Sequence, residues 1–241
     1  MNDLYDKTTG YADLDRLAVD KLQTKITFVQ QILENHAIPY AAPILVAGCG
    51  SGEEAVIIGD VFQVPTVGVD LNIPVEQSSF SVFCSLLKGD IGHLPFEDNT
   101  FGFAYSYHVL EHVPDHNHVL KELNRVLKPG SGLFIGFPNK RRLVAYISTH
   151  NEATLSERIR WNLRDYRKRL TGTFENHLGA HAGFTERGFI SDAKRYFPQV
   201  IPVRNDYFFG KYPKYKAILN TLIFLRLNEF AFPSNYFLCL K

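Results

Sequence analysis

The fold is decided by Ile44–Ala55, which reads ILVAGCGSGEEA. The first four residues are a continuous apolar run, as expected of a parallel strand that is covered on both faces. Three alternate glycines follow, and Glu53–Phe62 has the length and pattern of one helix. The next apolar run, Thr66–Asp70, completes a βαβ unit. The glycine turn therefore lies between a strand and a helix, where backbone amides can approach a ligand closely.

Strand and helix patterns alternate along the rest of the chain. Further strands are predicted over residues 81–87, 101–107, 133–137, 199–207 and 235–240. Helices are predicted over residues 13–37, 115–127, 185–196 and 215–227. This alternation predicts an α/β fold with a doubly wound, Rossmann-like, mainly parallel sheet of seven strands. A helical insert follows the fifth strand.

These elements suggest a division of the chain into four parts. They are an N-terminal helical lid (1–40), a Rossmann-like core (41–138), a basic helical insert that binds the substrate (139–183), and the rest of the core sheet with a helix and strands six and seven (184–241). The lid and the insert are the parts that we expect to contact an acceptor.

The composition narrows the class of protein. The chain has 241 residues, 45% of them hydrophobic, and a formal net charge of +1. This balance gives no overall attraction to nucleic acid or membranes, and we expect neither as a partner. The three cysteines form no CxxC pair, which argues against disulfides and thiolate metal sites. Since no secretory signal is evident and polar residues interrupt the apolar segment 217–232, we expect a cytoplasmic location.

The position of the third glycine in the turn distinguishes between two classes of nucleotide-like cofactor. A dinucleotide fingerprint, GxGxxG, would place glycine at position 53, but Gly52 is followed by Glu53 and Glu54. Acidic side chains at a helix start suit the helix dipole and repel a pyrophosphate. Asp70 ends the second strand about 20 residues beyond the turn, where an acidic side chain accepts hydrogen bonds from ribose hydroxyls. A cofactor without phosphates is favoured, and an NAD-dependent oxidoreductase stays as an alternative.

Five further motifs extend the pattern beyond the glycine turn. They are VGVD (67–70), GD (89–90), LPFEDNTF (94–101), VLEHVPD (109–115) and RVLKPG (125–130). With them, residues 44–138 resemble the class I methyltransferases that use S-adenosylmethionine, in particular a broad group acting on small molecules and in natural product biosynthesis. The resemblance implies S-adenosylmethionine as cofactor, S-adenosylhomocysteine as product, and residues 41–138 as the part that binds them.

The resemblance also implies where the cofactor lies. Its methionine and adenosine portions would border the turn, its ribose would meet Asp70, its adenine would meet Asp90, and its methionine end would lie beside His108. The complete set of implied cofactor-binding residues is Gly48, Cys49, Gly50, Asp70, Leu71, Asp90, Ile91 and His108. One departure stands out, because the first strand carries Val46 where the family often has an acidic residue.

Methyl transfer from a sulfonium is an in-line displacement, so alignment of the two reactants and exclusion of water supply much of the rate. A hydroxyl or amine acceptor benefits from a general base, and the candidates are His108, His112 and His181, with Glu111 nearby in sequence. A carboxylate acceptor needs no base. No metal ion is required.

The acceptor prediction rests on charge in the insert. Residues 140–170 contain nine basic and three acidic residues. Arginines can bind carboxylate or phosphate oxygens through two parallel hydrogen bonds, which suggests an anionic small molecule or a peptide carboxyl group as the acceptor of an O-methylation. The residues predicted to bind the acceptor are Arg141, Arg142, Arg158, Arg160 and, in the N-terminal lid, Tyr5 and Tyr11.

Two other functions remain open. His108, Glu111, His112 and His116 have a spacing that could gather a divalent cation, as in metal-assisted methyltransferases. A module that binds S-adenosylmethionine for regulation, without turnover, would carry the same cofactor residues. Binding without methyl transfer would separate that module from an enzyme.

Overall fold

The structure is a computed structural model, and it describes residues 16–73, 79–81, 83–143, 154–173 and 183–241. The strands are β1 (Ile44–Ala47), β2 (Thr66–Asp70), β3 (Ser79–Ser81), β4 (Cys84–Lys88), β5 (Phe101–Tyr107), β6 (Leu127–Pro138), β7 (Gln199–Pro202) and β8 (Ser234–Leu240). The helices are α1 (Arg16–Asn35), α2 (Glu53–Phe62), α3 (His116–Val126), α4 (Leu155–Leu170), α5 (Glu186–Ala193), α6 (Arg204–Lys211), α7 (Lys216–Phe224) and α8 (Asn228–Ala231), with 3₁₀ turns at Leu110–His112 and Pro213–Tyr215.

Within the described residues, the strands form one sheet in the order β3-β4-β2-β1-β5-β6-β8-β7. The five strands β4, β2, β1, β5 and β6 are parallel, and β8 runs antiparallel between β6 and β7. The prediction of a doubly wound, mainly parallel, seven-stranded sheet is confirmed. The short edge strand β3 adds an eighth strand that was not predicted, and it pairs antiparallel with β4.

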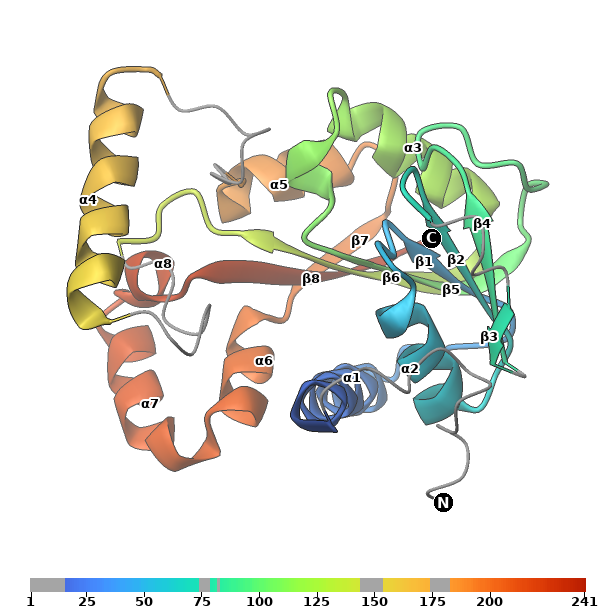
Figure 1. Cartoon of the computed structure of the whole chain (residues 1–241), viewed down its shortest axis with the longest axis horizontal. Coiled ribbons are helices and arrows are strands. Elements are labelled where there is room, and N and C mark those ends of the chain that lie inside the picture. The colour runs from blue at the N-terminus through green and yellow to red at the C-terminus, as the bar shows by residue number, and fades with distance from the viewer. Residues whose placement is uncertain (1–15, 74–78, 82, 144–153, 174–182) are drawn as a thin grey trace.

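Helices cover both faces of the sheet (Figure 1). One face packs against α1, α2 and α6, through apolar residues such as Ile26, Ile57 and Tyr207. The other face packs against α3 and α5, through residues such as Leu123 and Phe189. Since β1 is buried along its whole length, its continuous apolar run is what a strand between two helical layers requires.

The predicted strand 199–207 is wrong in its second half. The strand β7 ends at Pro202, and α6 begins at Arg204. Its aromatic residues suggested a strand, but Arg204, Tyr207 and Phe208 have helical spacing and all three are buried. Burial against α1 and β8 therefore outweighs their strand propensity.

Two other strands have shifted bounds. The strand predicted over 81–87 divides into β3 and β4. The strand predicted over 133–137 begins at Leu127, because Leu127 already pairs with Phe101 before a shift in the β5–β6 register that contains Gly130. By contrast, the bounds of α2 and β5 agree with the predicted residues.

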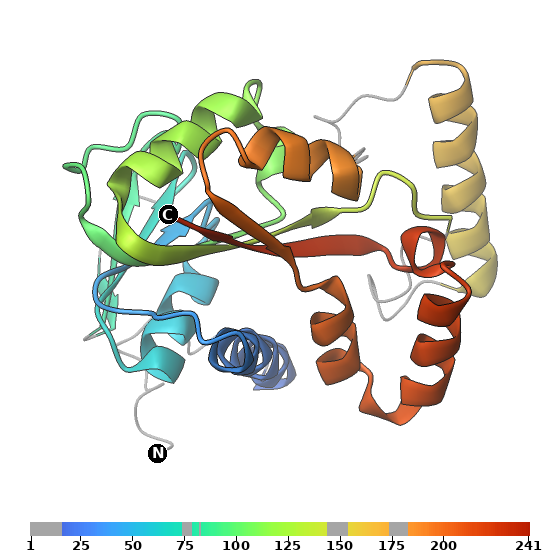
Figure 2. The ribbon, with the colours of Figure 1, turned by 180° about the vertical axis from the view of Figure 1, so that it is seen from behind.

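Of the predicted insert, the structure describes residues 139–143, 154–173 and 183, and its helix α4 lies at the end of the molecule beside α7 and α8 (Figures 1 and 2). A capping box, formed by Thr154 and Glu157, begins the helix. Its contacts with the chain after β6 include the Tyr166 hydroxyl, which donates to the Arg142 carbonyl at 3.3 Å, and Arg169, which donates to the Lys140 carbonyl at 2.8 Å. No described helix is long and apolar enough to cross a membrane.

Candidate active site

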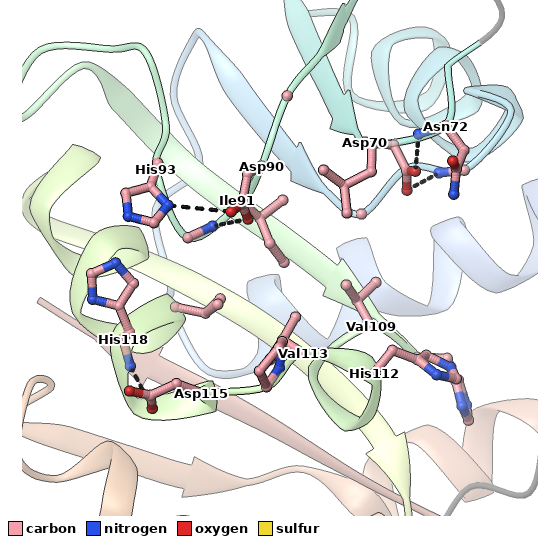
Figure 3. Close-up of a pocket in the computed structure, with 18 of the residues that line it drawn as sticks. Asp70, Asn72, Asp90, Ile91, His93, Val109, His112, Val113, Asp115 and His118 are labelled. Carbon is pink, nitrogen blue, oxygen red and sulfur yellow. Dashed lines mark hydrogen bonds and ion pairs between the residues drawn. The ribbon is translucent and has the colours of Figure 1, made fainter. Parts of the chain in front are cut away.

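A cavity of about 680 Å³ opens at the carboxyl ends of β1, β2, β4 and β5. In open α/β sheets, ligands bind at this edge of the sheet, and the volume is typical of a site for a small molecule. The residues that line it are Gly48, Gly50, Asp70, Leu71, Asn72, Gly89, Asp90, Ile91, Gly92, His93, Tyr107, His108, Val109, His112, Val113, Pro114, Asp115, His118 and Val119. Figure 3 shows Asp70 and Asp90 along one edge, with Val109 and Val113 along the other.

The glycine turn forms one wall of the cavity. Gly48 and Gly50 have φ angles of 76° and 56°, in the left-handed region that favours glycine. A side-chain carbon on Gly48 would collide with the side chain of Val109, whereas one on Gly50 would meet no protein atom within 4 Å. The open space beside Gly50 is therefore a place where a ligand can approach the backbone directly.

Asp70 lies at the end of β2 and is tied to the turn. Its Oδ2 accepts a hydrogen bond from the Gly50 amide at 2.9 Å, and its Oδ1 accepts one from the Asn72 amide at 2.9 Å. Each carboxylate oxygen has more than one acceptor position, so both can still accept a hydrogen bond from a ligand hydroxyl. The side chain is thus held at the cavity edge in a fixed orientation.

Asp90 follows β4 at the far side of the same edge. Its Oδ1 accepts from the Gly92 amide at 2.8 Å, and its Oδ2 lies 3.2 Å from His93 Nδ1. The hydrogen bond from Gly92, and then the one from His93, lower the pKa of Asp90. The ring of His118 lies against that of His93, with centroids 4.9 Å apart. An anionic carboxylate and two imidazoles therefore surround this end of the cavity.

His108 and Glu111 form a pair at the end of β5. His108 has a φ of 57°, and its Nδ1 lies 3.2 Å from Oε1 of Glu111. The Glu111 side chain has no exposed surface, and its oxygens have no hydrogen-bond partner of good geometry among the described residues. His112 lines the same cavity. Two of the three predicted base candidates are therefore brought together, while His181 lies outside the described residues.

A partly buried polar cluster surrounds Tyr107. The ring of Tyr107 lines the cavity, and Lys25 Nζ lies 3.9 Å from the centre of that ring. Lys25 also pairs with Glu54, and the Tyr107 hydroxyl lies 3.4 Å from that of Tyr236. Burial, and then the charge of Lys211, lower the pKa of Lys25 to about 7 despite this pairing. The contacts with Lys25 and Tyr236 hold the Tyr107 ring in place.

Several predicted site residues do not line the cavity. Cys49 is buried under the turn, and burial raises the pKa of its thiol to about 12, so it stays protonated. Arg141 pairs with Glu229 at 2.5 Å, and Arg142 is buried, with its guanidinium donating to the Asn139 carbonyl at 3.0 Å. Arg160 is exposed on α4. Their roles toward a ligand stay predictions.

Three other predicted residues have no described side chain. Tyr5 and Tyr11 lie outside the described residues, and the side chain of Arg158 is not described. The metal alternative needed His108, Glu111, His112 and His116 together. His116 instead lies with its Nε2 3.0 Å from Asp192 on α5. Within the described ranges, no three His, Cys, Asp or Glu side chains are grouped so that they could hold a metal ion.

Sequence reasoning missed five polar residues of the cavity: Asn72, His93, Tyr107, Asp115 and His118. Asn72 and His93 follow predicted ligands by two and three positions, so a closer reading of each turn could have found them. Tyr107 was predicted only as the end of a strand. His118 is brought to the cavity by the start of α3, and nothing in its local sequence signals that position.

The geometry agrees with a comparison against known families. Residues 45–135 match the family model described as a methyltransferase domain. Over this segment the chain is similar to methyltransferase domains. The matched segment runs from β1 into β6, so it includes every residue that lines the cavity.

Curated relatives match the same part of the chain. The "Sterol 4-C-methyltransferase strm-1" of Caenorhabditis elegans is 36% identical over 96 residues, which cover 36% of this chain and 28% of the relative. A "Demethylmenaquinone methyltransferase" of Staphylococcus aureus is 31% identical over 125 residues, which cover 46% of this chain and 52% of the relative. The chain thus spans about half, or less, of the length of these relatives.

Solved structures share the fold over most of the chain. The phosphoethanolamine N-methyltransferase 2 of Haemonchus contortus, solved with S-adenosyl-L-methionine, has a TM-score of 0.54 and 14% identity, covering 99% of this chain and 59% of its own. The cyclase SpnF has a TM-score of 0.52 and 13% identity, covering 89% of this chain and 78% of its own. Since one fold serves a methyltransferase and a cyclase, this likeness defines the fold of the chain alone.

Proposed function

We propose that the chain binds S-adenosylmethionine in this cavity and transfers its methyl group to a small or peptidic acceptor. The observation that carries the proposal is the convergence of the glycine turn, Asp70 and Asp90 around one cavity, in a segment that matches a methyltransferase family. When bound, the cofactor supplies a sulfonium-activated methyl group. The protein residues supply binding, orientation and exclusion of water.

The described residues suit each part of this cofactor. The oxygens of Asp70, fixed by Gly50 and Asn72, can accept hydrogen bonds from the two ribose hydroxyls. Leu71 and Ile91 both line the cavity and offer apolar surface to the adenine ring. The anionic Asp90 can accept a hydrogen bond from an exocyclic amine. The open space beside Gly50 leaves room for the rest of the molecule.

His108 and His112 are the described groups that could take a proton from an acceptor hydroxyl or amine. Glu111 lies 3.2 Å from His108 Nδ1, so this contact can favour one orientation of the imidazole. The other ring nitrogen of His108, Nε2, therefore does not contact Glu111. Glu111 therefore acts as a positioning residue.

The acceptor of the proposed reaction has two candidate classes. O-methylation of an anionic small molecule or a peptide carboxyl group is supported by the basic residues of α4 and of the segment after β6. An apolar acceptor is supported by the cavity wall of Tyr107, Val109 and Val113, and by relatives named for a sterol and a demethylmenaquinone. Turnover assays with a carboxylic acid and with a hydrophobic phenol would discriminate the two classes.

Calorimetry tests the cofactor site. We expect S-adenosylmethionine and S-adenosylhomocysteine to bind the wild type with micromolar affinity, and Asp70→Ala to weaken both by about 100-fold, because two charge-assisted hydrogen bonds are worth about 3 kcal/mol or more. Asp98→Ala is the matched control, since Asp98 is an exposed aspartate that pairs with Arg125 and does not line the cavity. Preference for NAD would overturn the proposal.

A transfer assay separates the enzyme from a regulatory module. A donor with an isotopically labelled methyl group would be incubated with the wild type and a panel of both acceptor classes. Labelled product that depends on Asp70 would support methyl transfer. Tight cofactor binding with no transfer to any acceptor in the panel would favour the module.

A further inference from the structure

Helix α7 is an apolar helix that packs against the core along one side and leaves much of its apolar surface exposed. It reads KAILNTLIF, and of its nine residues only Leu219 is buried. Helix α2, which reads EEAVIIGDVF, is similarly apolar and buries six of its ten residues. A surface helix with so much apolar sequence is unusual in a protein that faces water on all sides, and it indicates an interaction surface.

The exposed apolar side chains extend from the 3₁₀ turn before α7 into α8. We call them the α7–α8 face: Tyr215, Ile218, Phe224, Leu225, Leu227 and Phe230. Phe224 is the most exposed, at 85%. Three of the six side chains are aromatic. Aromatic side chains are enriched at the boundary between water and lipid. The α7–α8 face lies at the end of the molecule shared with α4 (Figures 1 and 2).

Cations lie before and within this face along the chain. Residues 211–232 contain Lys211, Lys214, Lys216 and Arg226 against one acidic residue, Glu229. The negative charge of Glu229 is already compensated by Arg141 at 2.5 Å. Lys214, Lys216 and Arg226 are exposed, and none of the three forms an ion pair with another described residue. The α7–α8 face therefore combines exposed apolar side chains with an excess of positive charge.

A second copy of the chain would suit this face poorly. A two-fold contact would place the same cations of both copies near each other, and like charges at an interface oppose association. A surface that combines anionic head groups with apolar chains complements both features at once. Short amphipathic helices with basic flanks bind membranes in this way, lying in the head-group region without spanning the bilayer.

We propose that the α7–α8 face binds the surface of an anionic phospholipid bilayer. The helix lies in the plane of the surface, with Phe224 and its neighbours among the acyl chains and with Lys214, Lys216 and Arg226 on lipid phosphates. The earlier expectation of no membrane partner rested on the net charge of the whole chain, which does not report this local pattern. The proposal does not depend on methyl transfer.

Vesicle co-sedimentation tests the proposal with the full chain. We expect at least tenfold stronger partitioning onto vesicles that contain 30% phosphatidylserine than onto pure phosphatidylcholine, decreasing at high salt. Phe224→Ser should weaken partitioning about tenfold or more, and Lys216→Gln about fivefold, because one cation near an anionic surface contributes about that factor. Both side chains are exposed, so the fold should tolerate both changes.

Leu170→Ser is the matched control. Leu170 is 88% exposed, and it ends α4 at the side remote from α7 (Figure 1). This variant should partition like the wild type. Equal loss in Phe224→Ser and Leu170→Ser, or no preference for anionic vesicles, would overturn the proposal. A dimer that Phe224→Ser dissociates, without vesicle binding by the wild type, would identify the face as a contact between copies and would also overturn it.

Discussion

Gly48 and Gly50 adopt similar backbone conformations, but their surroundings differ. Both have positive φ, so an alanine at either position costs about 1 kcal/mol or more in backbone strain. At Gly48 the added carbon also collides with Val109, which adds an overpacking cost of about 1–3 kcal/mol. We expect Gly48→Ala to lower the free energy of unfolding by about 2–4 kcal/mol and Gly50→Ala by about 1 kcal/mol, measured in urea.

Gly50→Ala, which we expect to be the milder of the two for stability, should have the larger effect on cofactor binding. The carbon added at Gly50 points into open space at the cavity, so Gly50→Ala should weaken cofactor binding with a small change in stability. The double variant Gly48→Ala with Val109→Ala serves as the control, because it removes the collision and leaves the backbone strain. Equal stabilities for Gly48→Ala and the double variant would show that the contact with Val109 contributes nothing.

Individual residues also show what the sequence could predict about the site. Gly48, Gly50, Asp70 and Asp90 were predicted from the turn and from motifs, and all line one cavity. Their neighbours along the chain set their positions, so local sequence was sufficient. The contact of Lys25 with Tyr107 was not predictable in the same way, because α1 and β5 meet only in the folded sheet.

At the scale of elements, α3 is fastened to the loop before β5 by two charged residues. Glu122 accepts from the Leu94 amide at 2.9 Å and pairs with Arg125 at 2.7 Å. Arg125 donates to the carbonyls of Leu94 and Phe96, at 3.0 and 2.8 Å, and pairs with Asp98 at 2.7 Å. The hydrogen bond from Arg125 lowers the pKa of Glu122 below its ordinary value.

This lowered pKa predicts a pH-dependent stability. Since the folded protein holds Glu122 ionised more strongly than the unfolded chain does, the stabilisation is present above the unfolded pKa, near 4.3, and is lost as pH falls through the folded value. We expect Glu122→Gln to lower the free energy of unfolding by about 1–2 kcal/mol at pH 7 and by much less at pH 3. Glu34→Gln, an exposed change on α1, should have no effect at either pH. A constant difference across the pH range would contradict the assignment to ionisation.

Elements differ in how well their sequences predict them. The helix Glu53–Phe62 and the strand Phe101–Tyr107 agree with their predictions, because a turn at each end and a clear apolar pattern define them locally. Residues 204–207 were predicted as strand and are helix. Their aromatic side chains fit either element by propensity, and the choice is made by packing against α1 and β8, which the sequence of the segment does not contain.

At the scale of the molecule, Lys241 links the last strand to the other face of the fold. Its ammonium group donates to the carbonyls of Asn124 and Leu127 at 2.8 and 2.7 Å, and to Oδ1 of Asn99 at 2.8 Å. Carbonyls at the end of α3 lack partners within the helix, and a cation there also suits the helix dipole. The end of β8 and the end of α3 are therefore stabilised together.

Removal of this group should weaken the whole fold. We expect Lys241→Met to lower the free energy of unfolding by about 2–3 kcal/mol, because it leaves several carbonyls of α3 with poorer partners. Lys194→Met, on the exposed end of α5, is the control and should change stability by less than about 0.5 kcal/mol. Unfolding monitored by circular dichroism measures both. A change for Lys241→Met no larger than the control would mean that water replaces the lysine at little cost.

The cavity has one further property, which concerns the order of folding. All the residues that line it lie between Gly48 and Val119, whereas the pairing of β6 with β8 joins Gly132 to Leu240 and Pro138 to Ser234. Closing a longer loop costs more chain entropy and is slower, so the early part of the chain can assemble before β8 enters between β6 and β7. A ligand of the cavity can then bind a partly folded chain. Such a ligand would stabilise the partly folded chain during its synthesis as well as the fully folded protein.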